Sequence, residues 1–262
     1  MAKPRRVSIP WLFSLFGGLL VLFVILPLAA TLLSTSPRML GETLLDREVL
    51  RSLTLTFLAA ALATVLALFS GVPLAYLLAR RQFWGKQLVE GIIDLPIVIP
   101  HTAAGVALLL VFGSRGVLGQ PLTSLGIYFV DRLAGIVVAM LFVSLPYLVD
   151  MSRAAFSAVD PEIESVALVD GASGWQVFWH VTLPQSWRGI LSGAMMMWSR
   201  GISEFGAVVI LAYHPKIVPV LIYERFEGFG LSAAQPVAVI LIVTVLVVFS
   251  ILRWLLHPKR DV

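Results

Sequence analysis

Long apolar segments alternate with short polar ones along almost the whole chain. Six stretches combine suitable length with low charge, at about 11–33, 53–79, 92–112, 133–150, 189–212 and 232–255. The hydrocarbon core of a bilayer is about 30 Å thick, and an α-helix of about 20 apolar residues crosses it. The pattern therefore predicts an all-α integral membrane protein with six transmembrane helices in a single domain, residues 1–262.

The composition agrees with a membrane protein and narrows its chemistry. Hydrophobic residues make up 59% of the chain and charged residues 13%, unlike an ordinary soluble domain. Cysteine is absent, so neither a disulfide framework nor a thiolate metal site is predicted, and we expect no metal or cofactor bound by this chain. The net charge is +4, but the basic residues cluster at the ends of apolar runs, which is typical of topology signals. We therefore expect the lipid bilayer, and no nucleic acid, as a partner.

The distribution of Lys and Arg predicts how the chain lies in the membrane. Eleven of them fall in the N-terminal segment, the C-terminal segment and the loops at 80–91 and 151–188, against seven in the other three loops. Positive residues mark the cytoplasmic side of a membrane protein. Much of the excess lies in short segments, with Arg80, Arg81 and Lys86 in one turn and Arg253, Lys259 and Arg260 after the last span. We predict a multi-pass cell-membrane protein with both termini and the 151–188 loop in the cytoplasm.

The 151–188 loop carries the signals of a helical hairpin. Asp160 is a good N-cap and Pro161 suits the first position of a helix. Gly171 can end that helix in the left-handed conformation. Ser173 can cap a second helix, which we expect to end before Pro184.

The second piece of this hairpin has a bulky apolar face, formed by Trp175, Phe178 and Trp179. Such a face suits an interfacial helix pair on the membrane or a docking surface for another protein. A DNA-reading helix-turn-helix is excluded, because residues 160–187 contain four acidic side chains and no Lys or Arg to meet phosphates. The residues alone leave the first two interpretations open.

The end of the hairpin resembles a known signature. Gly171, then nine residues, then Val181-Thr182-Leu183-Pro184, is similar to the cytoplasmic loop of the permease subunits of ABC importers. In that family the loop forms coupling helices that sit in a groove on the ATP-hydrolysing subunit. Here the usual Glu-Ala-Ala opening is replaced by Ser165-Val166-Ala167, with Glu164 one place early, which leaves open which acidic residue contacts the ATPase. The resemblance implies ATPase coupling by Glu164, Ser165, Val166, Ala167, Asp170, Gly171, Val181, Leu183 and Pro184.

Two charged residues lie inside the predicted fifth span. Arg200 and Glu204 are four residues apart, so we expect them on one helix face, with Arg200 about 16 Å from the cytoplasmic end. Charges at that depth face the bundle interior with a partner. The pair either orders the bundle or lies beside a permeation route. In the third span Pro96 and Pro100 predict a kink, and His101 just beyond it is either a donor to an anion or a hydrogen-bonded packing residue.

Three further stretches narrow the resemblance. Residues 203–206, Ser-Glu-Phe-Gly, are similar to the fifth-span signature of oxyanion permeases. PVLIYERF at 219–226 and LPIVIPHT at 95–102 resemble the molybdate and tungstate branch. The resemblance implies a type I ABC importer permease fold and uptake of molybdate or tungstate by alternating access. It also implies a homodimer, two ATPase subunits that hold ATP and Mg, an extracytoplasmic binding protein, and a translocation pathway containing Arg200, Glu204 and His101.

Other functions remain as alternatives. A permease for sulfate or another oxyanion differs only in its ligand, and an ATP-independent channel or secondary transporter would need no second subunit. We expect no enzyme and no catalytic residue in this chain, since Gly85-Lys86-Gln87 lacks the Ser or Thr and the upstream Gly of a phosphate loop. An intramembrane serine protease is disfavoured, because Ser173 lies in the predicted cytoplasmic hairpin. Residues 213–231 are a candidate contact for a binding protein, or a solvated outer loop.

Overall fold

The computed structural model describes the backbone of residues 11–256, and every regular element in this part of the chain is helical. The charges at both chain ends, Lys3, Arg5, Arg6, Lys259 and Arg260, lie outside the described residues. The helices form two compact units. One contains the chain up to Leu50 together with the chain from Ile222 onward, and the other spans Arg51–Leu221.

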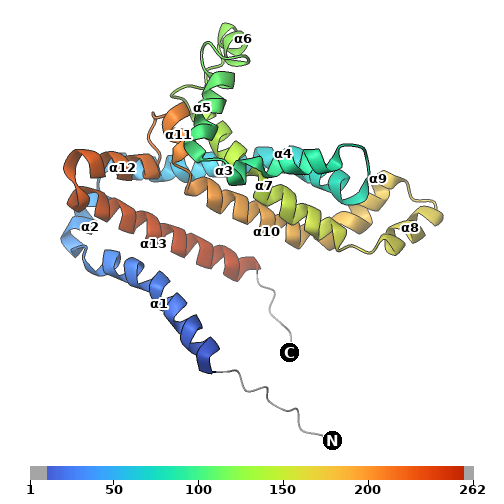
Figure 1. The fold of residues 1–262 in the computed structure, drawn as a ribbon, viewed down its shortest axis with the longest axis horizontal. Helices are drawn as coiled ribbons and strands as arrows, with labels where there is room; N and C mark the ends of the chain where they lie inside the picture. Colours follow the sequence, from blue (N-terminus) through green and yellow to red (C-terminus); the bar gives the residue numbers. More distant parts are fainter. Residues whose placement is uncertain (1–10, 257–262) are drawn as a thin grey trace, which may run out of the picture. The chain divides into compact units, whose positions relative to one another are not determined.

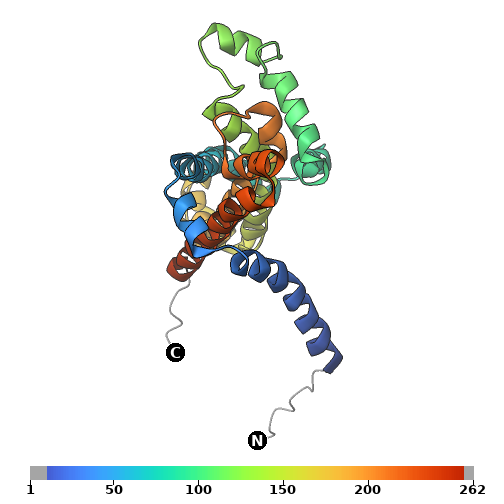
Figure 2. The same cartoon turned by 90° about the vertical axis from the view of Figure 1, so that its left-hand side faces the viewer.

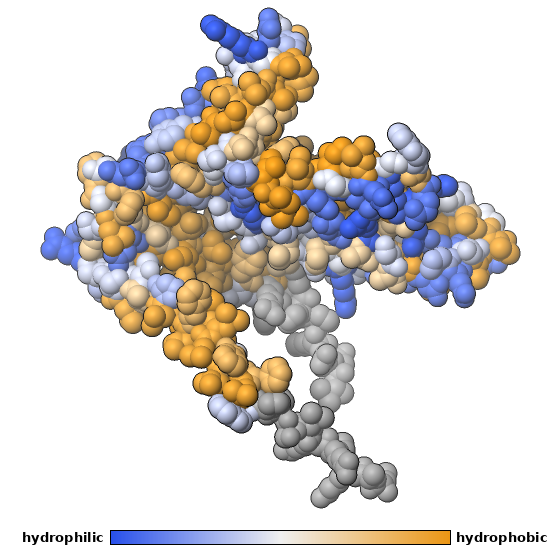
Figure 3. Space-filling model, viewed as in Figure 1, coloured by the Kyte–Doolittle hydropathy of each residue, from blue (hydrophilic) through white to orange (hydrophobic). Residues whose placement is uncertain are grey.

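The first unit is built around the last long helix, α13 (Leu231–Leu256), which packs against α1 (Trp11–Leu33) and α2 (Pro37–Leu44). Helix α1 contains no buried residue, and the face of it that Figure 3 shows is mostly hydrophobic. An apolar helix without protein cover suits a lipid environment. The side-chain amide of Gln235 in α13 donates to Thr35 Oγ1 at 2.8 Å, which joins the start of α13 to the end of α1.

The second unit contains the remaining helices. They are α3 (Arg47–Arg80, from Arg51 on), α4 (Lys86–Val98), α5 (His101–Phe112), α6 (Gly119–Ser124), α7 (Leu133–Ser157), α8 (Pro161–Val169), α9 (Gly174–Val177), the π-helix η1 (Phe178–Thr182), α10 (Leu183–Ile202), α11 (Gly206–Leu211) and the start of α12 (Val218–Phe229). Helix α10 packs along α7, α4 lies against α7, and α11 lies against α5 (Figure 1). A core cluster joins α3, α7 and α10 through Ala75, Leu78, Val149, Phe156 and Ile190.

Four helices in the described part of the chain are long and apolar enough to cross a membrane. They are α1, α3, α7 and the Leu231–Leu252 part of α13, and a fifth is gained if α4 and α5 are counted as one broken span. These helices correspond to five of the six predicted segments. The remaining predicted segment, 189–212, is divided between α10 and α11, so the count of six spans stays a prediction.

The predicted bend in the 92–112 segment is confirmed, but the prediction of a single helix there is wrong. Helices α4 and α5 are bent by 116° at a break between Val98 and His101, and both views show α5 turning away from α4 (Figures 1 and 2). Ile99 adopts an extended conformation because it precedes Pro100, whose ring disfavours the helical region for the residue before it. The two halves therefore run in different directions.

The prediction of a continuous helix over 189–212 is also wrong. Helix α10 ends at Ile202, and residues 203–205 leave the helical path before α11 begins at Gly206. Glu204 Oε1 accepts a hydrogen bond from the backbone N–H of Ala207 at 2.9 Å. This bond satisfies one of the free donors at the start of α11 and stabilises the break.

Candidate functional site

The hairpin predicted to couple to an ATPase, residues 160–182 and called the coupling hairpin below, has the helix starts and the turn that its local signals predict. Asp160 caps α8, with its carboxylate accepting from Glu162 N–H at 2.9 Å. Gly171 has φ +93°, so the turn requires the left-handed conformation that glycine adopts without steric cost. Ser173 forms a reciprocal capping box with Gln176 at the start of α9. Short-range side-chain bonds thus determine both helix starts.

The second helix of the hairpin does not end before Pro184, so that prediction is wrong. Helix α9 continues through the π-helix η1 directly into α10, and Pro184 occupies the first turn of α10. Proline removes one donor and crowds the preceding turn, and a π turn widens the helix at that point. Helix α9, η1 and α10 therefore form one continuous helical segment, which α8 meets at the Gly171 turn.

The outer surface of the hairpin is rich in exposed apolar side chains. They are Ile163, Val166, Leu168, Val169, Trp175 and Trp179. A hollow of about 400 Å³ lies beside them, lined by the chain around Gly171 and His180. Apolar surface rimmed by polar groups is typical of an interface with another protein.

The residues predicted to couple to an ATPase differ in their accessibility. Ser165, Val166, Asp170, Gly171 and Pro184 are exposed, whereas Ala167, Val181 and Leu183 are half-buried. Glu164 is turned inward, and its side chain is only 13% exposed. The hairpin thus presents most, but not all, of the predicted set on its surface.

Glu164 meets two residues that sequence reasoning did not select. Arg80, the last residue of α3, places Nη2 2.8 Å from Glu164 Oε1, and the same nitrogen donates to Val159 O at 3.0 Å. The hydroxyl of Thr182 donates to Glu164 Oε1 at 2.6 Å. Nothing in the spacing of these residues indicates that they meet, because Arg80 and Glu164 are 84 positions apart.

The second site is a charge cluster at the break between α10 and α11. Glu204 is fully buried, and its Oε2 lies 3.1 Å from Arg200 Nη2 and 2.8 Å from His101 Nδ1. His101 Nε2 lies 2.8 Å from the same guanidinium nitrogen. The same guanidinium nitrogen also lies 2.6 Å from His101 Nδ1, so both ring nitrogens of His101 lie within hydrogen-bond distance of Arg200. The prediction of an Arg200–Glu204 pair is confirmed, although Glu204 lies just beyond the helix rather than on its face.

Two glycines allow the cluster to form. A Cβ on Gly206 would lie 2.8 Å from His101 Cβ, and one on Gly105 would lie 2.8 Å from Ile210 Cβ. Helices α5 and α11 therefore approach each other closely because a glycine of each helix faces a residue with a side chain on the other. This contact brings His101 next to Glu204, although the two residues are 103 positions apart in the sequence.

The cluster combines a partly accessible cation with a fully buried anion. The Arg200 and His101 side chains are 21% and 31% exposed, whereas Glu204 is 0% exposed. Arg200 Nη1 also donates to Ser203 Oγ at 3.1 Å. A guanidinium held in this way can form hydrogen bonds with a passing oxyanion, provided that Glu204 remains to neutralise it in the anion's absence.

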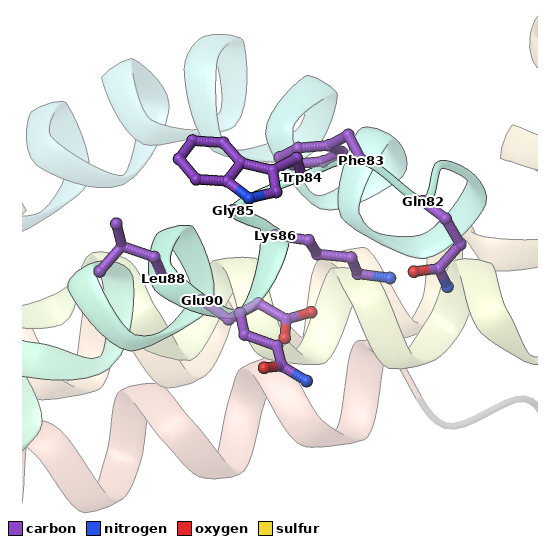
Figure 4. Close-up of a pocket in the computed structure, with 8 residues that line it drawn as sticks. Gln82, Phe83, Trp84, Gly85, Lys86, Leu88 and Glu90 are labelled. Carbon is purple, nitrogen blue, oxygen red and sulfur yellow. The ribbon is translucent and has the colours of Figure 1, made fainter.

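The turn between α3 and α4 contains the Gly-Lys pair that was considered as a phosphate loop. Its hollow is lined by residues 82–88 and Glu90, and Figure 4 shows the Lys86 side chain extending toward Gln82. Gly85 has φ +86° and provides the single tight turn before α4. The turn lacks the run of backbone N–H groups around a second glycine that holds phosphates.

The helical fold agrees with the known proteins that the chain resembles. The family described as binding-protein-dependent transport system inner membrane component matches residues 71–258. The chain belongs to this family. This permease is 42% identical over 259 residues to the molybdate/tungstate transport system permease protein WtpB of Pyrococcus furiosus, with 98% of the chain and 99% of the relative covered.

This permease is also similar to a sulfate transport permease and to a chain of a solved ABC transporter structure. It is 32% identical to the probable sulfate transport system permease protein cysT of Zygnema circumcarinatum, covering 95% of the chain and 88% of the relative. A chain in the crystal structure of a bacterial alginate ABC transporter, solved in complex with an alginate pentasaccharide-bound periplasmic protein, superposes with a TM-score of 0.72. That match covers 90% of both chains at 18% identity, so it shows the fold. The permease is thus a multi-pass membrane protein with the all-helical fold of ABC importer permeases.

Proposed function

We propose that this chain is the membrane-spanning subunit of an ATP-driven ABC importer that takes up molybdate, tungstate or both. The observation that carries the proposal is the 42% identity to a molybdate/tungstate permease over essentially the full length of both chains. The chain contributes no bond chemistry of its own in this proposal. ATP and Mg bind to a separate ATPase subunit, which docks on the exposed apolar face of the coupling hairpin.

The continuity of the hairpin with α10 supports a direct mechanical link. Movement imposed on α9 by an ATPase passes through η1 into α10, whose last turn carries Arg200. A helix rises 1.5 Å per residue and transmits displacement along its axis with little bending. Closure of two ATPase subunits would then change the position of the charge cluster, as alternating access requires.

The charge cluster is the proposed translocation gate. In the resting arrangement Glu204 neutralises Arg200, so the half-buried guanidinium carries no uncompensated charge. A molybdate or tungstate oxyanion can replace Glu204 as the partner of Arg200, with His101 as a second hydrogen-bond donor. Because the exposed fractions of Arg200 and His101 exceed that of Glu204, these two groups are the ones that an anion can reach.

The proposed assembly contains two copies of this chain, two cytoplasmic ATPase subunits and an extracytoplasmic oxyanion-binding protein. Both termini and the coupling hairpin lie on the cytoplasmic side, in agreement with the Lys and Arg distribution. The outer side carries the 213–231 segment, which is a candidate contact for the binding protein. It forms the helix α12 over most of its length rather than an open loop.

Sulfate is the second candidate substrate, because a sulfate transport permease matches at 32% identity. Molybdate, tungstate and sulfate are all tetrahedral oxyanions, so a guanidinium and an imidazole recognise each of them. The lower identity favours the molybdate and tungstate assignment. An ATP-independent channel or secondary transporter is disfavoured, because neither needs an exposed apolar hairpin that is continuous with α10.

The test is ATP hydrolysis in liposomes that contain this permease, its ATPase and its binding protein. Molybdate, tungstate and sulfate are added in turn, with phosphate as a control anion of similar shape. Stimulation by molybdate or tungstate and not by sulfate supports the proposal. Stimulation by sulfate alone changes the substrate, and anion uptake by the permease without the ATPase would overturn the importer mechanism.

A further inference from the structure

Arg80, Glu164 and Thr182 come from three separate parts of the second unit and meet at one carboxylate oxygen. Arg80 closes α3, Glu164 lies in α8, and Thr182 is the last residue of η1. Arg80 Nε and Nη2 lie 3.2 and 2.8 Å from Glu164 Oε1, and the Thr182 hydroxyl donates to the same oxygen at 2.6 Å. One carboxylate oxygen thus joins the coupling hairpin to the end of a long apolar helix.

The burial of these groups separates them from the exposed charges of the hairpin. The side chains of Arg80 and Glu164 are 14% and 13% exposed, and Thr182 is fully buried. Glu162, on the same helix, and Asp170, at its end, are both exposed. A partner that docks on the outer surface therefore reaches Glu162 and Asp170, whereas Glu164 is already enclosed by this chain.

An aromatic contact reinforces the same junction from the apolar side. The ring of Phe178 in η1 lies 4.9 Å from Tyr76 of α3 and 6.2 Å from Phe156 of α7, measured between centroids. Tyr76 and Phe156 also meet edge to face at 5.3 Å. Arg80 adds a bond to the carbonyl of Val159, beyond the end of α7. The hairpin is held by polar and aromatic contacts to both α3 and α7.

We propose that Arg80, Glu164 and Thr182 form a clamp that fixes the coupling hairpin to the end of α3, so that Glu164 is a positioning residue and not a contact for the ATPase. This inference rests on the proposed function, because it concerns how movement of the hairpin is passed on. Without the clamp, α8 can pivot at Gly171 while the rest of the bundle stays in place. ATP hydrolysis is then uncoupled from transport, although the docking surface remains intact.

The first experiment uses the purified permease without any partner. Backbone hydrogen exchange in α8 is compared for the wild type, Glu164→Gln, and the matched control Glu162→Gln from the exposed side of the same helix. The clamp predicts faster exchange over residues 161–169 in Glu164→Gln and unchanged exchange in the control. Equal exchange in all three proteins would overturn the clamp, whatever the transported substrate is.

The second experiment uses the reconstituted importer and measures ATPase affinity separately from the anions transported per ATP hydrolysed. Glu164→Gln and Thr182→Val should keep the ATPase affinity within about twofold of the wild type. Transport per ATP should fall about tenfold, because Thr182→Val removes a hydrogen bond to the carboxylate and Glu164→Gln removes the charge that strengthens the remaining bonds. Thr182→Ser retains the hydroxyl and should behave as the wild type.

The outcomes distinguish the clamp from its alternatives. Loss of ATPase affinity in Glu164→Gln with normal coupling in Thr182→Val would make Glu164 a docking contact and overturn the proposal. Normal transport per ATP in both variants would show that the junction does not transmit movement. Failure of the wild-type permease to bind any ATPase would refute the proposed function, while the exchange experiment would still test the clamp.

Discussion

The packing of α10 against α7 provides a quantitative test, because Gly189 and Gly193 of α10 allow the two helices to approach closely. A Cβ added at Gly189 would lie 2.3 Å from the Cβ of Ala155, with the Ala155 Cα next at 3.5 Å. Carbon atoms in contact prefer about 3.5 to 4.0 Å. Gly189→Ala therefore requires the two helices to separate by about 1.2 to 1.7 Å at this point.

The size of the effect follows from two opposing contributions. Overpacking of a tight contact costs about 1 to 3 kcal/mol. Replacing glycine by alanine within a helix gains up to about 1 kcal/mol. Gly91 in α4 provides the matched control. A Cβ there meets nothing within 4 Å, so Gly91→Ala shows only the stability gained from the higher helix propensity of alanine. The difference in stability between Gly189→Ala and Gly91→Ala should therefore be about 1 to 3 kcal/mol.

The assay is thermal unfolding in detergent, followed by the fluorescence of the seven tryptophans. Gly189→Ala should melt below Gly91→Ala. Adding Ala155→Gly should restore most of the loss, because the nearest remaining atom is then the Ala155 Cα at 3.5 Å. Equal melting of the two single variants, or no recovery in the double variant, would refute close packing of α7 and α10 at this position.

Three further predictions concern the hairpin, the charge cluster and the first unit. Gly171→Val should distort the turn, since a β-branched residue does not tolerate φ +93°, and ATPase co-purification should be lost; unchanged co-purification would count against docking at the hairpin. Arg200→Ala leaves Glu204 buried without its guanidinium partner, so we expect about 3 to 5 kcal/mol of destabilisation and loss of anion uptake, whereas normal melting and uptake would make the pair dispensable. The hydrogen bond from Arg225 holds the pKa of Asp46 below its usual range, so this contact stabilises the protein above about pH 4 and is lost as the pH falls through the lowered pKa. Melting temperatures measured from pH 6 to pH 3 should therefore fall less steeply in Asp46→Asn than in the wild type, and parallel curves would contradict this assignment.

The elements that sequence reasoning predicted correctly are those whose causes are local. Runs of apolar residues long enough to cross a bilayer become α1, α3, α7 and α13. Asp160 and Ser173 cap helices because each carboxylate or hydroxyl bonds a backbone N–H two or three residues away. Gly171 ends a helix because the left-handed conformation depends on its own side chain. All of these interactions act within a few residues along the chain.

The charge cluster shows where prediction from local patterns stopped. The i,i+4 spacing correctly predicted that Arg200 and Glu204 are paired. It did not predict the break at 203–205, after which Gly206 packs closely against His101 from another helix. The proline pattern indicated a kink near Pro100, but the size of the bend depends on the packing of α5 against α11.

By itself, therefore, the sequence determined the helical membrane class, the hairpin caps, the Gly171 turn and the Arg200–Glu204 pair, since each depends on spacing along the chain. Tertiary structure alone decided that Glu164 faces inward to Arg80, that His101 joins the intramembrane pair, and that the hairpin continues into α10. The first two depend on residues 84 and 103 positions apart. Contacts at such separations are determined by how helices pack, which no local pattern of residues encodes.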